Sequence, residues 1–164
     1  MGTARVLVGS VGKTVWIKVE GRGTFQNSGG VKDFTQQMIL RGHREFIVDL
    51  ERCEMMDSTF MGTLAGIALR LRELGQGELR VIRANIRSRE LLENLGLDRI
   101  IHVETGSESG APAGDGLTET VTGEKDTAHS TVLAAHEALI EANPDNEIRF
   151  RDVVEFLRQE EADD

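Results

Sequence analysis

The fold of this chain follows from one stretch of its sequence, FIVDLERCEMMDSTFMG at residues 46–62. Residues 46–50 are nearly all apolar, which is typical of a strand buried on both faces in the middle of a sheet. Asp57, Ser58 and Thr59 can accept hydrogen bonds from the free N–H groups of a first helical turn. The stretch therefore predicts a strand, a loop and then a helix that begins at or just after Asp57 and Ser58.

Strand and helix patterns alternate on both sides of this unit. The expected strands are residues 5–9, 14–19, 45–50, 79–83 and 99–103, and the expected helices are residues 31–39, 58–71 and 88–95. A glycine-rich segment, residues 21–30, is expected to be a loop before the first helix. The order β-β-α-β-α-β-α-β predicts an α/β fold with a mixed, partly parallel sheet.

The composition changes at residue 105. Residues 1–104 carry 15 Lys or Arg and 13 Asp or Glu, whereas residues 105–164 carry 4 and 15, so the acidity belongs to the C-terminal part. Residues 105–123 have the small and polar composition of a flexible linker. Residues 124–160 show helical spacing on both sides of Asn143-Pro144, which predicts an acidic helical hairpin. About 35 residues are too few to be stable alone, so the hairpin should dock on the α/β domain (residues 1–104), a twin subunit or a partner.

Composition also limits the partners and the compartment. A net charge of −9 disfavours nucleic acid and anionic membranes as partners. The single cysteine, Cys53, fits a reducing compartment. No apolar run reaches the length of a membrane span, and the N-terminus lacks a signal-peptide pattern. We therefore expect a cytoplasmic protein without a membrane span.

Three kinds of catalytic or cofactor chemistry are disfavoured. Gly9-Ser10-Val11-Gly12-Lys13-Thr14 resembles a phosphate-binding loop, but the first glycine of that motif is missing and a strand, not a helix, follows it. The four histidines have no metal-ligand spacing with Cys53 or with carboxylates. Ser58 lacks a nucleophile elbow and has no base nearby in the sequence. We therefore expect no enzymatic activity, no metal and no cofactor.

Ser58 itself has two interpretations. It can simply cap the helix. Alternatively, it is an exposed hydroxyl whose phosphate would meet the positive end of the helix dipole. Gly62 and Gly66 lie one turn apart on the same side of this helix, and they predict a bare surface that another protein or element can approach closely.

The element order and several motifs resemble the STAS domain, and more narrowly the anti-sigma factor antagonists of bacterial partner-switching systems. The matching motifs are Val48-Asp49-Leu50, Met56-Asp57-Ser58 with Gly62 four residues on, Gly21 after the second strand, and Leu91-Leu92-Glu93-Asn94-Leu95-Gly96-Leu97 running to Ile100-Ile101. The resemblance covers residues 4–104. It implies a STAS-like mixed sheet with helices packed on one face, followed by the C-terminal helical hairpin.

The resemblance also implies a function and partners. In that family the unphosphorylated antagonist binds an anti-sigma factor that is a serine kinase of the GHKL ATPase type, which releases the sigma factor. The kinase phosphorylates the serine that aligns with Ser58 and so breaks the complex, and a PP2C-type phosphatase restores it. The implied phosphosite-flanking and partner-binding residues are Asp57, Thr59, Phe60, Met61, Gly62, Gly21 and Thr24.

Two departures from the family pattern and two alternatives accompany this interpretation. Phe60 replaces a glycine, which is expected to make the partner surface bulkier and more apolar, and residues 22–26 lack the acidic residue often found there. Thr59 is a second, less favoured phosphoacceptor. The alternatives are an accessory subunit of a membrane lipid-transport complex, docked through Phe60 and Met61, and a scaffold of a signalling assembly that self-associates through the hairpin.

Overall fold

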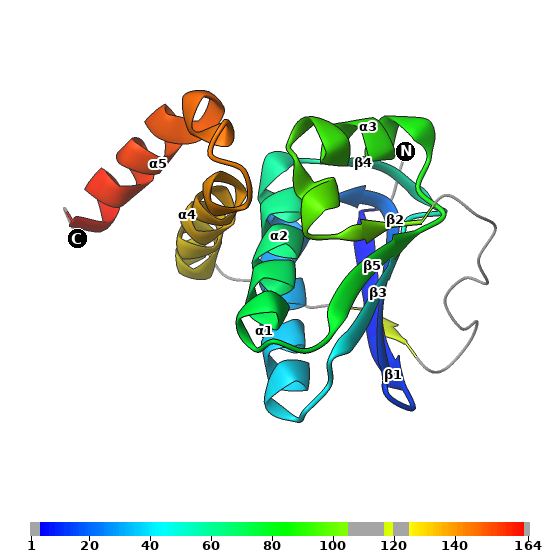
Figure 1. The fold of residues 1–164 in the computed structure, drawn as a ribbon. Coiled ribbons are helices and arrows are strands. Elements are labelled where there is room, and N and C mark those ends of the chain that lie inside the picture. Colours follow the sequence, from blue (N-terminus) through cyan, green and yellow to red (C-terminus); the bar gives the residue numbers. More distant parts are fainter. Residues whose placement is uncertain (1–3, 105–116, 120–124, 163–164) are drawn as a thin grey trace.

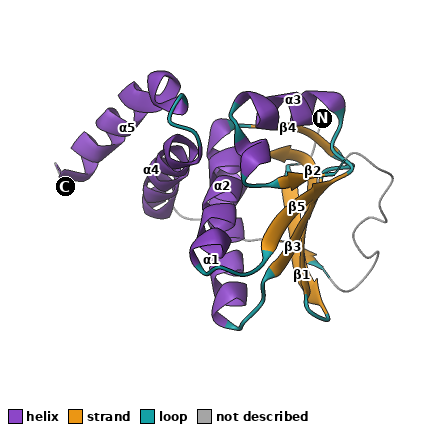
Figure 2. Cartoon of the chain, viewed as in Figure 1, coloured by secondary structure: helices purple, strands orange, loops and turns teal. Residues whose placement is uncertain are grey.

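The computed structural model describes residues 4–104, 117–119 and 125–162 (Figure 1). These residues form a sheet, helices on one side of it, and a C-terminal pair of helices (Figure 2). The strands are β1 (Arg5–Val11), β2 (Thr14–Gly23), β3 (Glu45–Asp49), β4 (Cys53–Met56), β5 (Glu78–Ile82), β6 (His102–Val103) and β7 (Thr118–Glu119). The helices are α1 (Phe25–Leu40), α2 (Ser58–Glu73), α3 (Ile86–Asn94), the short 3₁₀ helix η1 (Leu97–Arg99), α4 (Lys125–Ala142) and α5 (Asn146–Ala162).

The sheet is mixed, as the element order predicts. Its strand order is β6-β5-β3-β2-β1-β7, and β4 pairs with the end of β2 off this path. Strands β2, β3, β5 and β6 run parallel, whereas β1 is antiparallel to both β2 and β7. The predicted α/β fold is therefore confirmed, with β3 near the middle of the sheet.

The core lies between the sheet and helices α1 and α2. Strand side chains in paired register fill it in rows, and the members of these rows are fully or almost fully buried: Val15, Phe46 and Leu79 in one row, and Ile17, Val48 and Val81 in the next. Helix α2 covers these rows with the apolar stripe that the helical spacing predicts, namely Met61, Leu64, Ala65, Ala68 and Leu71. This packing fixes α2, and with it Ser58, at one end of the sheet.

The glycine-rich segment is not the loop that was predicted. Helix α1 begins at Phe25, because Thr24 caps it and Asn27 bonds back to the Thr24 N–H in a reciprocal capping box. Strand β2 likewise extends to Gly23 instead of ending at Val19. Glycines 29 and 30 are therefore helical despite their low helix propensity, and local capping outweighs that cost.

The remaining differences lie in short elements. The strand expected at residues 99–103 is shorter, because η1 (Leu97–Arg99) includes its first residue and only His102–Val103 form β6. Strand β7 lies inside the segment that is expected to be a linker, and it pairs with Leu7 and Val8 of β1. The rest of that predicted linker, residues 105–116 and 120–123, lies outside the described residues, and the division into domains stays a prediction.

The C-terminal helices α4 and α5 form a hairpin that docks on the α/β body. Helix α4 packs against α2 and α1, and α5 lies on the outer side of α4 (Figure 1). Asn146, at the start of α5, is buried and donates its amide to the carbonyls of Leu95 and Leu139 at 2.9 and 2.8 Å. Of the three docking sites considered from the sequence, the body of the same chain is the one occupied. None of the helices among the described residues has the length and apolarity that crossing a membrane requires.

Candidate functional site

The start of α2 is held in place by strand β4. This strand pairs with the end of β2, with Gly23 opposite Met56, and the Asp57 N–H donates to the Gly23 carbonyl at 2.9 Å. Gly21 lies at a bulge in this pairing with a φ of 80°, a conformation that favours glycine. Gly21 therefore shapes the backbone that leads to Ser58.

Asp57 joins the beginnings of two helices. One carboxylate oxygen accepts from the N–H of Phe60 at 2.8 Å and caps α2, and the other accepts from the N–H of Phe25 at 2.9 Å and holds the first residue of α1. Thr24 in turn caps α1 with its hydroxyl. Asp57, Thr24 and the neighbouring Gly21 thus make a rigid polar frame around the helix starts, with the helix cap on Asp57 and not on Ser58.

Ser58 is the first residue of α2, and its side chain is partly buried. Its neighbour Thr59 is only 5% exposed, so a modifying enzyme could not reach the Thr59 hydroxyl without unfolding the helix start. Since Asp57 already supplies the cap, the Ser58 hydroxyl is available for another interaction. Of these two neighbouring residues, Ser58 is therefore the more exposed.

The other interaction is with a histidine from the hairpin. The Ser58 hydroxyl lies 2.9 Å from Nε2 of His136 in α4. Nδ1 of His136 lies 2.7 Å from the Val132 carbonyl, which can only accept, so the proton of the neutral ring is assigned to Nδ1. Nε2 is then the acceptor, and the Ser58 hydroxyl donates to it. The His136 ring is 4% exposed and meets Phe150 edge-on, with ring centroids 5.0 Å apart.

His136 is a base within hydrogen-bond distance of Ser58, although no base lies near Ser58 in the sequence. A serine with a histidine acceptor is one element of a nucleophilic site, but such a site also needs room for a substrate. Neither Ser58 nor His136 lines the open groove described below, and the His136 ring, which belongs to the hairpin, is buried. The pair is therefore better explained as a contact that holds α4 on α2.

The prediction that Phe60 makes the partner surface more apolar is wrong. Phe60 is fully buried, and its ring packs so closely on Gly23 that a Cβ there would overlap it. Met61 is also buried, at 5% exposure. The larger side chain at position 60 fills the core at the junction of β2 and α2, and neither residue presents an apolar surface in this conformation.

Gly62 and Gly66 both face α4, and Gly62 is in close contact with its backbone. A Cβ at Gly62 would overlap the backbone carbonyl of Ala135, whereas a Cβ at Gly66 would lie 3.9 Å from the Cβ of Ala138, an ordinary contact. The prediction that these glycines allow another element to approach closely is confirmed, and the element is α4 of the same chain.

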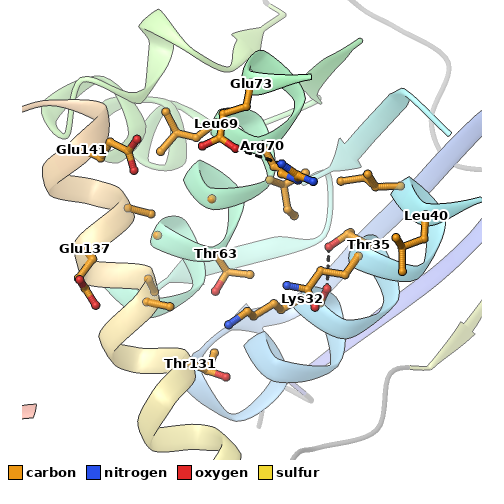
Figure 3. Close-up of a pocket in the computed structure, with 18 residues that line it drawn as sticks. Lys32, Thr35, Leu40, Thr63, Leu69, Arg70, Glu73, Thr131, Glu137 and Glu141 are labelled. Carbon is orange, nitrogen blue, oxygen red and sulfur yellow. Dashed lines mark hydrogen bonds and ion pairs between the residues drawn. The ribbon is translucent and has the colours of Figure 1, made fainter. Parts of the chain in front are cut away.

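An open groove of about 610 Å³ lies beside this contact, between α1, α2 and α4 (Figure 3). Small α4 residues, Ala134, Ala135 and Ala138, line one wall. Lys32 from α1 and Arg70 from α2 lie opposite the acidic residues of α4. Helix α4 therefore covers α2 closely but leaves the space beside α1 unfilled.

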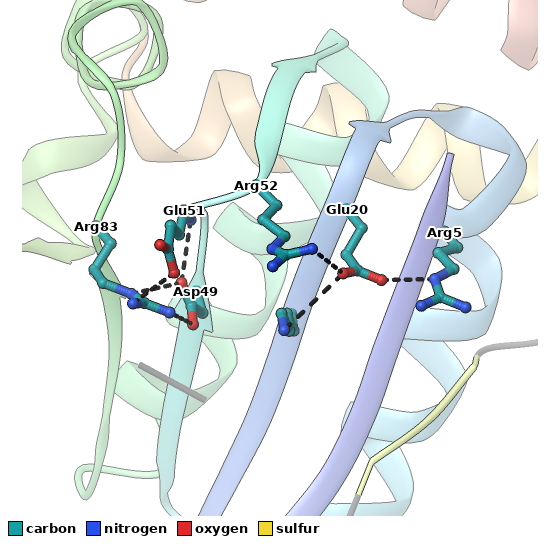
Figure 4. A network of polar contacts seen from close by, with 7 residues as sticks. Arg5, Glu20, Asp49, Glu51, Arg52 and Arg83 are labelled. Carbon is teal, nitrogen blue, oxygen red and sulfur yellow. Dashed lines mark hydrogen bonds and ion pairs between the residues drawn. The ribbon is translucent and has the colours of Figure 1, made fainter. Parts of the chain in front are cut away.

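A polar network supports the loop that leads from β3 to the site (Figure 4). Asp49, 1% exposed at the end of β3, binds the Arg83 guanidinium at 2.7 and 3.2 Å and accepts from the Glu51 N–H. The hydrogen bond to Asp49 is the main cause that raises the pKa of Arg83 above its ordinary value. Nearby, Glu20 bonds to Arg5 at 2.6 Å and lies 3.9 Å from Arg52. These pairs fix the strand ends on which the β3–β4 loop rests.

Cys53 is a free cysteine whose side chain is buried, and we predict that it is unreactive in the folded chain. Burial raises the pKa of its thiol to about 11, so the unreactive thiol form dominates at neutral pH. We expect iodoacetamide at pH 8 to leave Cys53 unmodified in the native chain and to modify it fully in urea, as measured by intact mass. Rapid labelling of the native chain would contradict this placement.

The arrangement agrees with a known family. Residues 6–103, more than half of the chain, match the family model described as "Mlab, STAS domain". The chain belongs to the STAS domain family. No curated protein sequence matches it.

Several solved structures share this STAS fold. The anti-sigma factor antagonist SpoIIAA of Bacillus in its unphosphorylated form is 22% identical, with a TM-score of 0.54 over 61% of this chain and 88% of that one. Its phosphorylated form is 20% identical, with a TM-score of 0.50 over 61% and 91%. TM1081 of Thermotoga maritima, a candidate antagonist, is 19% identical, with a TM-score of 0.55 over 61% and 86%. At these identities the likeness shows the fold alone.

Proposed function

We propose that this STAS protein is an anti-sigma factor antagonist that works by binding and not by catalysis. It binds an anti-sigma factor that is also a serine kinase of the GHKL ATPase type, and phosphate on Ser58 switches the binding off. The observation that carries the proposal is the partly buried Ser58 hydroxyl at the first residue of α2, left uncommitted to capping because Asp57 is the cap. Structural likeness to antagonists supports the same class.

The start of α2 is a place where negative charge is tolerated by the helix. A phosphate at the beginning of α2 is compatible with the helix, because the dipole and the first-turn N–H groups favour negative charge there. The same phosphate adds nearly two negative charges to the surface that a partner contacts. Phosphate on Ser58 would leave the chain folded but would prevent the partner from binding, which is what a reversible switch requires. We include a PP2C-type phosphatase and a cytoplasmic location in the proposal.

The test compares Ser58→Ala with Ser58→Asp. We expect Ser58→Ala to bind the cognate kinase constitutively and Ser58→Asp to bind at least about 30-fold more weakly, since an unpaired charge in an interface costs about 2 kcal/mol or more. Binding of the purified full chain to each GHKL-type serine kinase from the same organism would be measured by calorimetry.

Thr59→Ala is the matched control, because it changes the adjacent hydroxyl, which is buried. It should leave phosphate incorporation at Ser58 in place. Equal binding of Ser58→Ala and Ser58→Asp to the kinase would refute the proposed switch.

The accessory subunit of a membrane lipid-transport complex is the second candidate. The observation that favours it is the description of the matching family model, which names Mlab and not an antagonist. Because Phe60 and Met61 are buried, this role would need another docking surface than the one first expected. Co-purification of the full chain with membranes, and not with a soluble kinase, would favour it.

A further inference from the structure

The hairpin covers the surface that the proposed function requires to be open. Helix α4 lies along α2 from the Ser58 end to Gly66, with His136 over the Ser58 hydroxyl and the backbone of Ala135 against Gly62. This is a close contact between helices, in which the absence of a side chain at Gly62 allows the backbones to meet. No second protein could occupy the same face at the same time.

Resting on the proposed function, we propose that the hairpin is an intramolecular competitor of the partner. Helix α4 occupies in cis the helix-binding face of α2, and the partner reaches Ser58 only when α4 moves away. The kind of partner that fits is a helix with small residues along its contact stripe, because Ala135 and Ala138 of α4 make the contact in this structure.

The hairpin has the properties of a ligand that can be displaced. Among the residues whose side chains the structure describes, its own buried cluster is small, consisting of Leu133, Val154 and Leu157, so its order depends on docking. The groove beside α1 is open to solvent, so the apolar side chains that line it are not covered by protein. A partner helix that filled this groove as well would pack on α1 and α2 more completely than α4 does.

Two sets of contacts anchor the hairpin on the body. His136, within α4, contacts Ser58, and beyond the C-terminal end of α4 Asn146 bonds to Leu95 while Asn143 packs on Gly96. The contacts of Asn143 and Asn146 do not involve Ser58. Helix α4 can therefore lose its contact with Ser58 while the turn of the hairpin remains attached to the body.

Phosphate on Ser58 should weaken the same contact. Phosphorylation removes the hydroxyl proton that His136 accepts, and it brings charge into a site where His136 is 4% exposed. The hairpin itself is acidic, with Glu137 and Glu141 on α4. The modified chain should thus expose both α2 and α4.

Two measurements test the competition, and the first needs no partner. Amide hydrogen exchange over α4 is compared in the full chain between Ser58→Asp and the wild-type chain, because Ser58→Ala would itself remove the hydrogen bond to His136. We expect at least about tenfold faster exchange in Ser58→Asp, since it adds an unsolvated charge to the contact. The strands β3 and β5 serve as the internal control for folding. Equal α4 exchange in Ser58→Asp and the wild-type chain would overturn the coupling between Ser58 and the hairpin.

The second measurement locks the hairpin with a disulfide. In Gly66→Cys with Ala138→Cys the two Cβ atoms would lie 3.9 Å apart, within the range of a disulfide. The binding test with Ser58→Ala identifies the kinase. The oxidised double-cysteine chain should bind this kinase at least about tenfold more weakly than the same chain after reduction. Equal binding in both redox states would overturn the competition, even where Ser58→Ala and Ser58→Asp still differ.

Failure of the two proposals can be told apart. If no kinase distinguishes Ser58→Ala from Ser58→Asp, the proposed function fails. The exchange measurement still decides whether Ser58 and α4 are coupled, because it involves only this chain.

Discussion

Replacing Gly62 with alanine is expected to detach α4 from α2 while the α/β body stays folded. The added Cβ would overlap the backbone carbonyl of Ala135, and a backbone atom cannot rotate away as a side chain can. Overpacking of this kind costs about 1–3 kcal/mol, so amide exchange in α4 should speed up about tenfold to a hundredfold. Within α2 itself the change is favourable, because alanine is about 0.5–1 kcal/mol better than glycine in a helix.

Gly66→Ala is the matched control, since it makes the same change one turn along the same helix. Its Cβ would lie 3.9 Å from Ala138, an ordinary contact, so α4 should remain docked and the chain should become slightly more stable. Hydrogen exchange with mass spectrometry distinguishes the two variants peptide by peptide. Unchanged protection of α4 in Gly62→Ala would contradict the close docking of the hairpin.

Replacing Phe60 with alanine should destabilise the chain by about 3–5 kcal/mol, the usual cost of removing a buried aromatic ring. Phe60 has no exposed surface and packs on Gly23, where β2 ends and the frame around Ser58 begins. The cavity would therefore weaken both the core and the position of the phosphoacceptor. Urea unfolding followed by circular dichroism gives the free energy of unfolding.

Phe25→Ala is the control for this prediction, because the Phe25 ring is 48% exposed at the start of α1. It should cost less than about 1 kcal/mol. An equal loss of unfolding free energy in Phe60→Ala and Phe25→Ala would contradict the placement of Phe60 in the core.

The elements that sequence pattern predicted well are those with strong periodicity. The apolar run at 46–50 gave the central strand β3, and the stripe from Met61 to Leu71 gave the buried face of α2. Both signals reflect burial, which repeats with the period of the element. The spacing of Gly62 and Gly66 also predicted a close helix contact, because a helix face without side chains allows another backbone to approach.

The start of α1 was predicted wrongly because local hydrogen bonds decided it. Glycines 29 and 30 suggested a loop, yet the reciprocal bonds between Thr24 and Asn27 start the helix at Phe25. A signal was present: a threonine three residues before an amide side chain resembles a capping box. The burial of Phe60 also had a signal, since it shares the helical stripe of Leu64 and Leu71.

The contact between Ser58 and His136 could not be predicted from spacing. The two residues are 78 positions apart, and no local pattern relates them. His136 lies in α4, and no pattern in the sequence of that helix indicates which residue its ring contacts. Docking of the hairpin on the body brings the pair together, and that docking depends on the shapes of two surfaces.

The central claim is that Ser58 is the residue that receives phosphate. The most direct test is intact and peptide mass measurement of the full chain after incubation with ATP and each GHKL-type serine kinase from the same organism. The account predicts one added phosphoryl group, mapped to Ser58 and absent from Ser58→Ala. Phosphate on Thr59 alone, or equal incorporation in Ser58→Ala, would contradict it.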